Sequence, residues 1–168
     1  RRFQKITSEM SKAINEQINK ELFSAYLYKA MSLEANAKGL NGTASWLKIQ
    51  ADEEVGHADR FEEYLLDQSC DVKMEAIEKP DGSFKDLKEL FDRILSHEKA
   101  VTASILNLVK IARKNDDVAT EIMLQWFVTE QVEEEKNPTE ILQKIEMIHG
   151  STGGLYMLDK ELGKRGKD

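Results

Sequence analysis

Four long stretches of the chain repeat apolar residues at alternating steps of three and four, the spacing that gives a helix one buried face. The third stretch is the clearest, because a single acidic residue interrupts an otherwise apolar stripe. Its stripe consists of Leu87, Phe91, Ile94, Glu98, Val101, Ile105, Leu108 and Ala112. We expect helices at about residues 7–38, 42–69, 83–115, 116–149 and 154–163. The pattern therefore predicts an all-α fold, with residues 1–168 as one domain.

The connections between these helices suggest how they are arranged. The first and second helices, and the third and fourth, are joined by short turns, so each pair should form an antiparallel hairpin. A longer link at 70–82 can span the length of a bundle. Candidate caps and stops are Thr7 or Ser8, Gly39, Ser83 and Gly150. We expect a four-helix bundle with a long crossover between helices two and three, plus a short C-terminal helix.

Every one of the four stripes contains a potential metal ligand near the middle of its helix. These residues are Glu21, Glu54, His57, Glu98 and Glu134, with Gln131 beside the last. Because helices of similar length lie side by side in a bundle, mid-helix positions lie at similar depth. The sequence therefore predicts one polar layer across the core.

Such a layer requires a source of positive charge. An unpaired buried carboxylate costs several kcal/mol, and no lysine or arginine occupies the stripes nearby. Four carboxylates carry about −4, which matches two divalent cations. Oxygen ligands with one imidazole suit iron or manganese, and the absence of thiolates argues against a structural zinc site.

Glu54 and His57 are the most specific pair, because an i, i+3 spacing lets both side chains bind one ion. A lone Glu-x-x-His is weak, since a solvated glutamate beside a partly buried histidine explains it as well. Tyr28 can be plain core or a hydrogen-bond donor to a ligand, and Gln131 a satisfied core amide or a weak ligand. Off the stripes, His97 and His149 are expected at the surface.

Composition and charge exclude several classes of function. The chain has 24 Lys and Arg against 31 Asp and Glu, a net charge of −7, which disfavours nucleic-acid binding. Cys70 is the only cysteine, so an internal disulfide and a Cys-pair metal site are excluded. No stretch reaches the ~20 apolar residues of a membrane span. The first residues carry no secretory signal pattern, so a cytoplasmic location is expected.

Five segments together resemble the prokaryotic non-haem ferritins, over nearly the whole chain. The segments are NKELFSAYLY at 19–28, DEEVGHA at 52–58, HE at 97–98, WFVTEQVEEE at 126–135 and LYMLDKEL at 155–162. The resemblance implies a ferritin-like bundle that oxidises Fe(II) with O₂ or H₂O₂ and stores the Fe(III) mineral in a hollow shell of 24 copies.

The resemblance also implies roles for individual residues. The first iron would be held by Glu21, Glu54 and His57. The second would be held by Glu98 and a bridging Glu54, with Gln131 and Glu134 nearby and Tyr28 in support. The third iron site, towards the cavity, would comprise Glu53, Glu130, Glu133 and Glu134.

Related families differ at recognisable positions. Bacterioferritins place a haem-ligating methionine where Val55 stands and repeat Glu-x-x-His on the fourth helix, so no haem is expected here. Rubrerythrins add cysteine pairs, and the mini-ferritins lack the fifth helix.

Two other functions remain open on the residues alone. A di-metal oxygenase with an organic substrate usually carries Glu-x-x-His on two helices, and one is present here. A purely structural bundle with acidic patches needs no metal at all. Pro138, one turn after Glu134, is expected to kink or locally break the fourth helix at a cost of ~3 kcal/mol.

Overall fold

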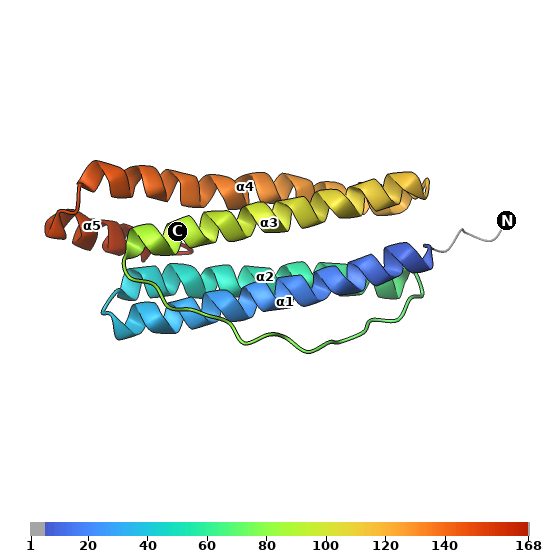
Figure 1. The fold of residues 1–168 in the computed structure, drawn as a ribbon, viewed down its shortest axis with the longest axis horizontal. Helices are drawn as coiled ribbons and strands as arrows, with labels where there is room; N and C mark the ends of the chain where they lie inside the picture. The colour runs from blue at the N-terminus through green and yellow to red at the C-terminus, as the bar shows by residue number, and fades with distance from the viewer. Residues whose placement is uncertain (1–5, 168) are drawn as a thin grey trace.

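The computed structural model describes residues 6–167, which form five helices and no strand (Figure 1). The helices are α1 (Ser8–Ala37), α2 (Asn41–Asp67), α3 (Leu87–Lys114), α4 (Val118–Ile148) and α5 (Thr152–Leu162). The predicted all-α bundle with a short fifth helix is confirmed. None of the helices in this part of the chain is long and apolar enough to cross a lipid bilayer.

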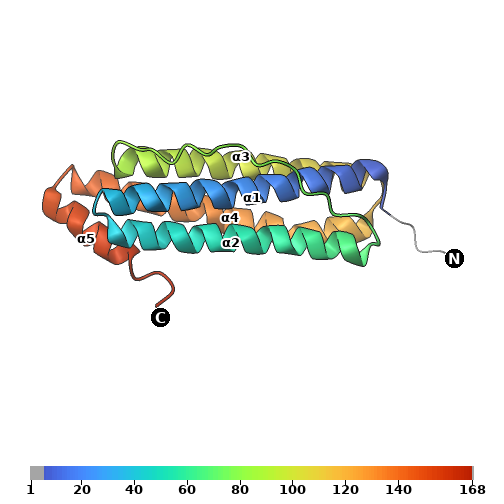
Figure 2. The same ribbon diagram turned by 90° about the horizontal axis from the view of Figure 1, so that it is seen from below.

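The bundle consists of two antiparallel hairpins, α1 with α2 and α3 with α4 (Figure 1). Since α2 and α3 run in the same direction, the chain must return to the starting end between them. The link at 68–86 does this by running along the outside of the bundle beside α1 (Figure 2). The long crossover predicted from the link length is therefore present.

Most helix ends follow the predicted signals, and the start of α3 does not. Thr7 caps α1 by accepting a hydrogen bond from the Met10 backbone N–H at 3.1 Å. Ser83 is not a cap, because its hydroxyl donates to Asp81 at 2.5 Å. Asp86 instead caps α3, so the helix begins at Leu87, four residues later than expected. The Ser83 hydroxyl therefore bonds to the Asp81 carboxylate in the link instead of capping α3 as the sequence pattern had predicted.

Pro138 lies inside α4 without interrupting it, so of the two predicted effects, a kink or a local break, the break is wrong. The helix is continuous from Val118 to Ile148, and Pro138 is buried. The residue still removes the N–H that would bond to the Glu134 carbonyl. Buried apolar residues on both sides, Leu124 and Ile141 among them, hold α4 against the bundle and offset that loss.

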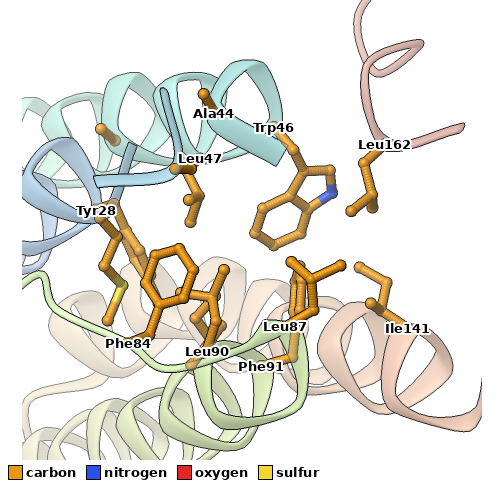
Figure 3. Packing of buried hydrophobic residues seen from close by; sticks show 14 of the residues in the cluster. Tyr28, Ala44, Trp46, Leu47, Phe84, Leu87, Leu90, Phe91, Ile141 and Leu162 are labelled. Carbon is orange, nitrogen blue, oxygen red and sulfur yellow. The ribbon is translucent and has the colours of Figure 1, made fainter. Parts of the chain in front are cut away.

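The apolar core is divided into two clusters, one towards each end of the bundle. The cluster near α5 contains Trp46, whose ring lies 5.3 Å from that of Phe91, and Leu162 of α5 packs beside it (Figure 3). The other cluster includes Met10 and Phe61. On each long helix, the residues between the clusters are the polar ones that interrupt the stripe. Division of the core by a polar layer is what the stripes predicted.

Candidate metal centre

The side chains predicted to point inward are all buried in the middle of the bundle. They are Glu21, Tyr28, Glu54, His57, Glu98, Gln131 and Glu134. Their helical spacing explains this, because each occupies a position that would otherwise continue an apolar stripe. The four helices therefore contribute to one layer.

Three groups of carboxylate and imidazole side chains within residues 6–167 have the geometry of a metal site. In each group the ligand atoms lie within 4.8 Å of one another. The groups are Glu21–Glu54–His57, Glu54–Glu98–Glu134 and His57–Glu130–Glu134. Because Glu54, His57 and Glu134 each belong to two groups, the three form one continuous set of ligands.

The first group contains a carboxylate oxygen that lacks a partner. His57 Nδ1 lies 3.2 Å from Glu54 Oε2 and 3.8 Å from Glu21 Oε2. Gln17 Nε2 donates to the other Glu21 oxygen, Oε1, at 3.1 Å. Glu21 Oε2 is buried and accepts no hydrogen bond. Buried acceptors are rarely left unpaired in proteins, so this oxygen and its neighbours fit a bound cation.

Hydrogen-bond donors orient the carboxylates of the second group. The Tyr28 hydroxyl donates to Glu98 Oε1, and Gln131 Nε2 donates to Glu98 Oε2 at 3.2 Å. The Gln50 amide donates to Glu134 Oε2. Of the two roles considered for Tyr28, plain core residue or hydrogen-bond donor to a ligand, the structure thus agrees with the donor to a candidate ligand. Gln131 is likewise a hydrogen-bond donor to the candidate ligand Glu98 in this structure.

The third group lies towards the surface and includes only part of the predicted outer site. His57 Nε2 is 3.9 Å from Glu130 Oε1, and Glu130 is half-buried. Glu53 is exposed and forms an ion pair with Arg165 at 2.9 Å. Glu133 is exposed and belongs to none of the three groups. The structure thus brings Glu130 to the layer and leaves Glu53 and Glu133 outside it.

Burial sets the electrostatics of the carboxylates. Removal from water raises the pKa of Glu98 to about 8 and that of Glu134 to about 7. The pKa of Glu54 is also raised by burial, with the Glu21 charge adding to the effect. A divalent cation would stabilise the charged form of such carboxylates, whose ionisation burial opposes when no metal is bound.

His57 is the only positive partner within this layer. Burial lowers its pKa, but the nearby Glu21 and Glu54 carboxylates outweigh that effect and raise the pKa to about 11. Burial likewise opposes ionisation of Glu21, and the same contact with His57 reverses the effect, so the Glu21 pKa is lowered. A proton on His57 therefore occupies the place where a metal ion would neutralise these groups.

Three neighbours of the layer were not predicted as site residues. Gln17 and Gln50 stand four residues before Glu21 and Glu54, so the i, i+4 spacing was a usable signal for both. The Trp126 ring lies edge-on to His57, with centroids 5.5 Å apart. Nothing in the sequence pattern places Trp126 there, because it lies beside the stripe of α4.

The two histidines outside the layer differ from each other. His149 is exposed, as expected. His97 is half-buried, which makes the prediction of a surface position wrong. Its Nε2 lies 2.8 Å from Ser24 Oγ, and its ring meets that of Tyr28 edge-on at 5.8 Å. The α1–α3 contact covers a ring that the stripe of α3 alone would leave in solvent.

Comparison with known proteins agrees with this geometry. The ferritin-like domain model matches residues 11–148. A bacterial non-haem ferritin of Escherichia coli is 38% identical over 154 residues, 92% of this chain and 93% of that protein. One from Campylobacter jejuni is 36% identical over 155 residues, again 92% of this chain and 93% of that protein.

A solved structure is similar over nearly the full length. It is described as an open pore ferritin from the hyperthermophilic archaeon Archaeoglobus fulgidus, and it has a TM-score of 0.94 at 37% identity. The superposition covers 96% of this chain and 98% of that one. With the sequence matches, the shared fold shows that this chain belongs to the ferritin-like family, the family of the bacterial non-haem ferritins.

Proposed function

We propose that this protein is an iron-storage ferritin subunit that oxidises Fe(II) at the buried layer. In this proposal the oxidant is O₂ or H₂O₂, and the Fe(III) product is deposited as mineral inside a hollow shell of 24 copies. Iron is thus the substrate and the cargo of the protein. The observation that carries the proposal is the set of three overlapping carboxylate and imidazole groups, the first of which contains the unpartnered Glu21 oxygen.

The residues divide naturally into two adjoining positions for iron. Glu21, Glu54 and His57 would hold one ion, and Glu54, Glu98 and Glu134 the other. The shared Glu54 is suited to bridge them. Gln131 would lie next to Glu98, near the second ion. With both ions bound, the carboxylates would be charged and neutralised, which removes the need for a proton on His57.

Each side chain has a definable part in the reaction. Hard carboxylate oxygens favour Fe(III) over Fe(II), so the layer makes the bound iron easier to oxidise. Each Fe(II) gives one electron to the oxidant. The Tyr28 hydroxyl holds Glu98 in its orientation. Towards the surface, Glu130 would take up the product, with the exposed Glu53 and Glu133 forming the outer part of a third site.

An oxygenase acting on an organic substrate is less well supported. Such an enzyme needs a pocket beside its metals to hold that substrate. Two grooves on the described residues, of about 880 and 670 Å³, lie at the α1–link junction and between α4 and α5. Neither is lined by a residue of the three metal groups.

Iron oxidation tests the chemical part of the proposal. Anaerobic loading should bind two Fe(II) per subunit at the layer, and admission of O₂ should oxidise them rapidly. Glu54→Gln keeps the shape of the side chain and should slow oxidation at least tenfold, because both positions lose a charged ligand. Glu63→Ala on the exposed face of α2 is the matched control and should leave the rate unchanged. Oxidation by Glu54→Gln at the unmodified rate contradicts the site.

Storage is tested separately by the size and content of the particle. Electron microscopy of the purified protein should show hollow shells, and iron loading should produce a dense core within them. A monomer or dimer that still oxidises iron would overturn storage and leave the oxidation chemistry standing.

A further inference from the structure

The C-terminal segment after α5 contacts α2 through the side chain of Arg165. One guanidinium nitrogen donates to the Trp46 carbonyl at 3.2 Å, and the other donates to Glu53 Oε2 at 2.9 Å. The guanidinium also lies over the Trp46 ring, 4.5 Å from its centroid. Only 20% of the Arg165 side chain is exposed. Three contacts from one side chain therefore hold the tail against the bundle.

Glu53 is the point where this tail meets the layer. It directly precedes the ligand Glu54, and the Glu53 charge acts on Glu134 from outside the core. Among the acidic residues of the proposed third site, Glu53 pairs with a cation from outside the layer, the Arg165 guanidinium, whereas Glu130 lies 3.9 Å from His57 Nε2. In the proposed third site, an ion held by His57, Glu130 and Glu134 (called the outer group below) would also take Glu53 as a ligand, and Glu53 is the carboxylate that the Arg165 guanidinium pairs with here.

We propose that Arg165 competes with the metal ion for Glu53, so that filling the outer group with a divalent cation releases the C-terminal tail from α2. The inference rests on the proposed function and adds a regulatory residue to it. Arg165 is a positioning residue in this scheme, since it acts on the metal only through Glu53.

The strength of the contact suits a reversible switch. Glu53 is 42% exposed, and ion pairs in contact with water contribute little net stability. The exchange replaces one positive charge on Glu53 by two, and three neighbouring carboxylate and imidazole ligands share the incoming ion. Once Arg165 leaves Glu53, its remaining contacts are the stacking on Trp46 and one backbone hydrogen bond. The tail can then detach from α2. When the metal ion leaves the outer group, Glu53 can pair with Arg165 again and the tail returns to α2.

Trp46 provides a direct report on the tail, independent of iron oxidation. The chain has two tryptophans, so Trp126→Phe leaves Trp46 as the only one. Zn²⁺ is a suitable probe, because it is redox-inactive and accepts carboxylate and imidazole ligands. In this background, calorimetry would follow Zn²⁺ binding by the assembled protein, and Trp46 emission would follow the tail. Glu130→Ala identifies the binding phase that belongs to the outer group.

Arg165→Gln removes the competing charge, and Lys164→Gln is the matched control. The control deletes the same charge one residue away, from an exposed side chain that forms no ion pair with any of residues 6–167. We expect Arg165→Gln to tighten the outer Zn²⁺ phase by about fivefold, the scale of one exposed ion pair. The Trp46 emission should change with that phase in the Lys164→Gln protein and stay constant in the Arg165→Gln protein.

The possible outcomes separate this inference from the function on which it rests. The competition is overturned if Arg165→Gln and Lys164→Gln bind Zn²⁺ at the outer group with equal affinity. It is also overturned if the Trp46 emission does not change when Zn²⁺ fills the outer group. Both results leave the metal layer intact. Failure of the unmodified protein to bind Zn²⁺ at the layer overturns both. Glu53→Gln offers a second check, because it breaks the ion pair from the α2 side with the tail sequence unaltered and should abolish the Trp46 response to Zn²⁺.

Discussion

The Asp159 carboxylate on α5 caps α2 at Thr43, although the two residues are 116 positions apart. Asp159 Oδ1 accepts from the Thr43 backbone N–H at 2.7 Å and from its hydroxyl at 2.6 Å, and Oδ2 accepts from the Gly42 N–H at 3.2 Å. The residue at the N-cap position of α2, Leu40, has no side chain that can do this. A side chain of α5 thus provides the N-terminal cap that α2 lacks in its own sequence.

Removal of this cap should weaken the end of the bundle. Asp159→Ala leaves two N–H groups and a hydroxyl without acceptors, and we expect a loss of about 1 kcal/mol, the usual value of an N-cap. Asp159→Asn keeps one acceptor oxygen and should lose less. Urea unfolding followed by circular dichroism measures both. Identical midpoints for the two variants and the unmodified protein would show that the cap contributes no stability.

Gly42 should tolerate no side chain, because α5 approaches it too closely. A Cβ at this position would lie 1.8 Å from the Asp159 carbonyl oxygen. Gly42→Ala should displace and loosen α5, so trypsin should cleave faster at Lys160, which is already exposed but held in helical backbone. Gly56→Ala in the same helix is the control, since no atom lies within 4 Å of its Cβ. That variant should be more stable by up to about 1 kcal/mol. Equal proteolysis of both variants contradicts the proposed packing.

The metal-free protein should become less stable as pH rises from about 5 to 8. The pKa of Glu98 is raised from 4.5 to about 8 and that of Glu134 to about 7, both chiefly by burial. Between these limits the folded state binds more protons than the unfolded state, so each rise in pH favours unfolding. Despite burial, contacts with Glu21 and Glu54 raise the His57 pKa from 6.5 to about 11, which extends the same trend above pH 6.5. Each proton of difference contributes about 1.4 kcal/mol per pH unit.

Thermal unfolding of the metal-free protein at pH 5.5, 7 and 8.5 tests this dependence. Glu98→Gln should flatten the profile, because it removes one of the titrating groups. Added Zn²⁺ should stabilise the protein more at pH 8 than at pH 5.5, since the ion replaces protons on its ligands. A melting temperature that rises from pH 5.5 to 8.5 in the absence of metal would contradict the assignment.

Replacement of Pro138 should stabilise α4. Pro138→Ala restores an N–H that can bond to the Glu134 carbonyl, and proline inside a helix costs about 3 kcal/mol relative to alanine. The substitution also removes about two buried methylenes, worth about 1.6 kcal/mol. We expect a net gain of about 1 kcal/mol in urea unfolding. A lower midpoint would mean that Pro138 packing outweighs the missing hydrogen bond.

The buried layer was predictable because helical period and burial are linked. A residue that occupies an apolar stripe must face the core, and Glu21, Glu54, His57, Glu98 and Glu134 all do so. The start of α3 was not predictable in the same way. Ser83 and Asp86 are both acceptable caps, and a contact with Asp81 in the link decided between them.

By itself, the sequence determined the number of long helices, the face that each one buries and the polar layer that interrupts all four. These properties depend on residues three or four positions apart, whose relation is the same in any helix. Only the tertiary structure decided the cap that Asp159 gives to Thr43, the Arg165 contact with Glu53 and the burial of His97 against Tyr28. Those contacts join residues 69 to 116 positions apart. They exist only because helix packing and the path of the link bring distant side chains within reach.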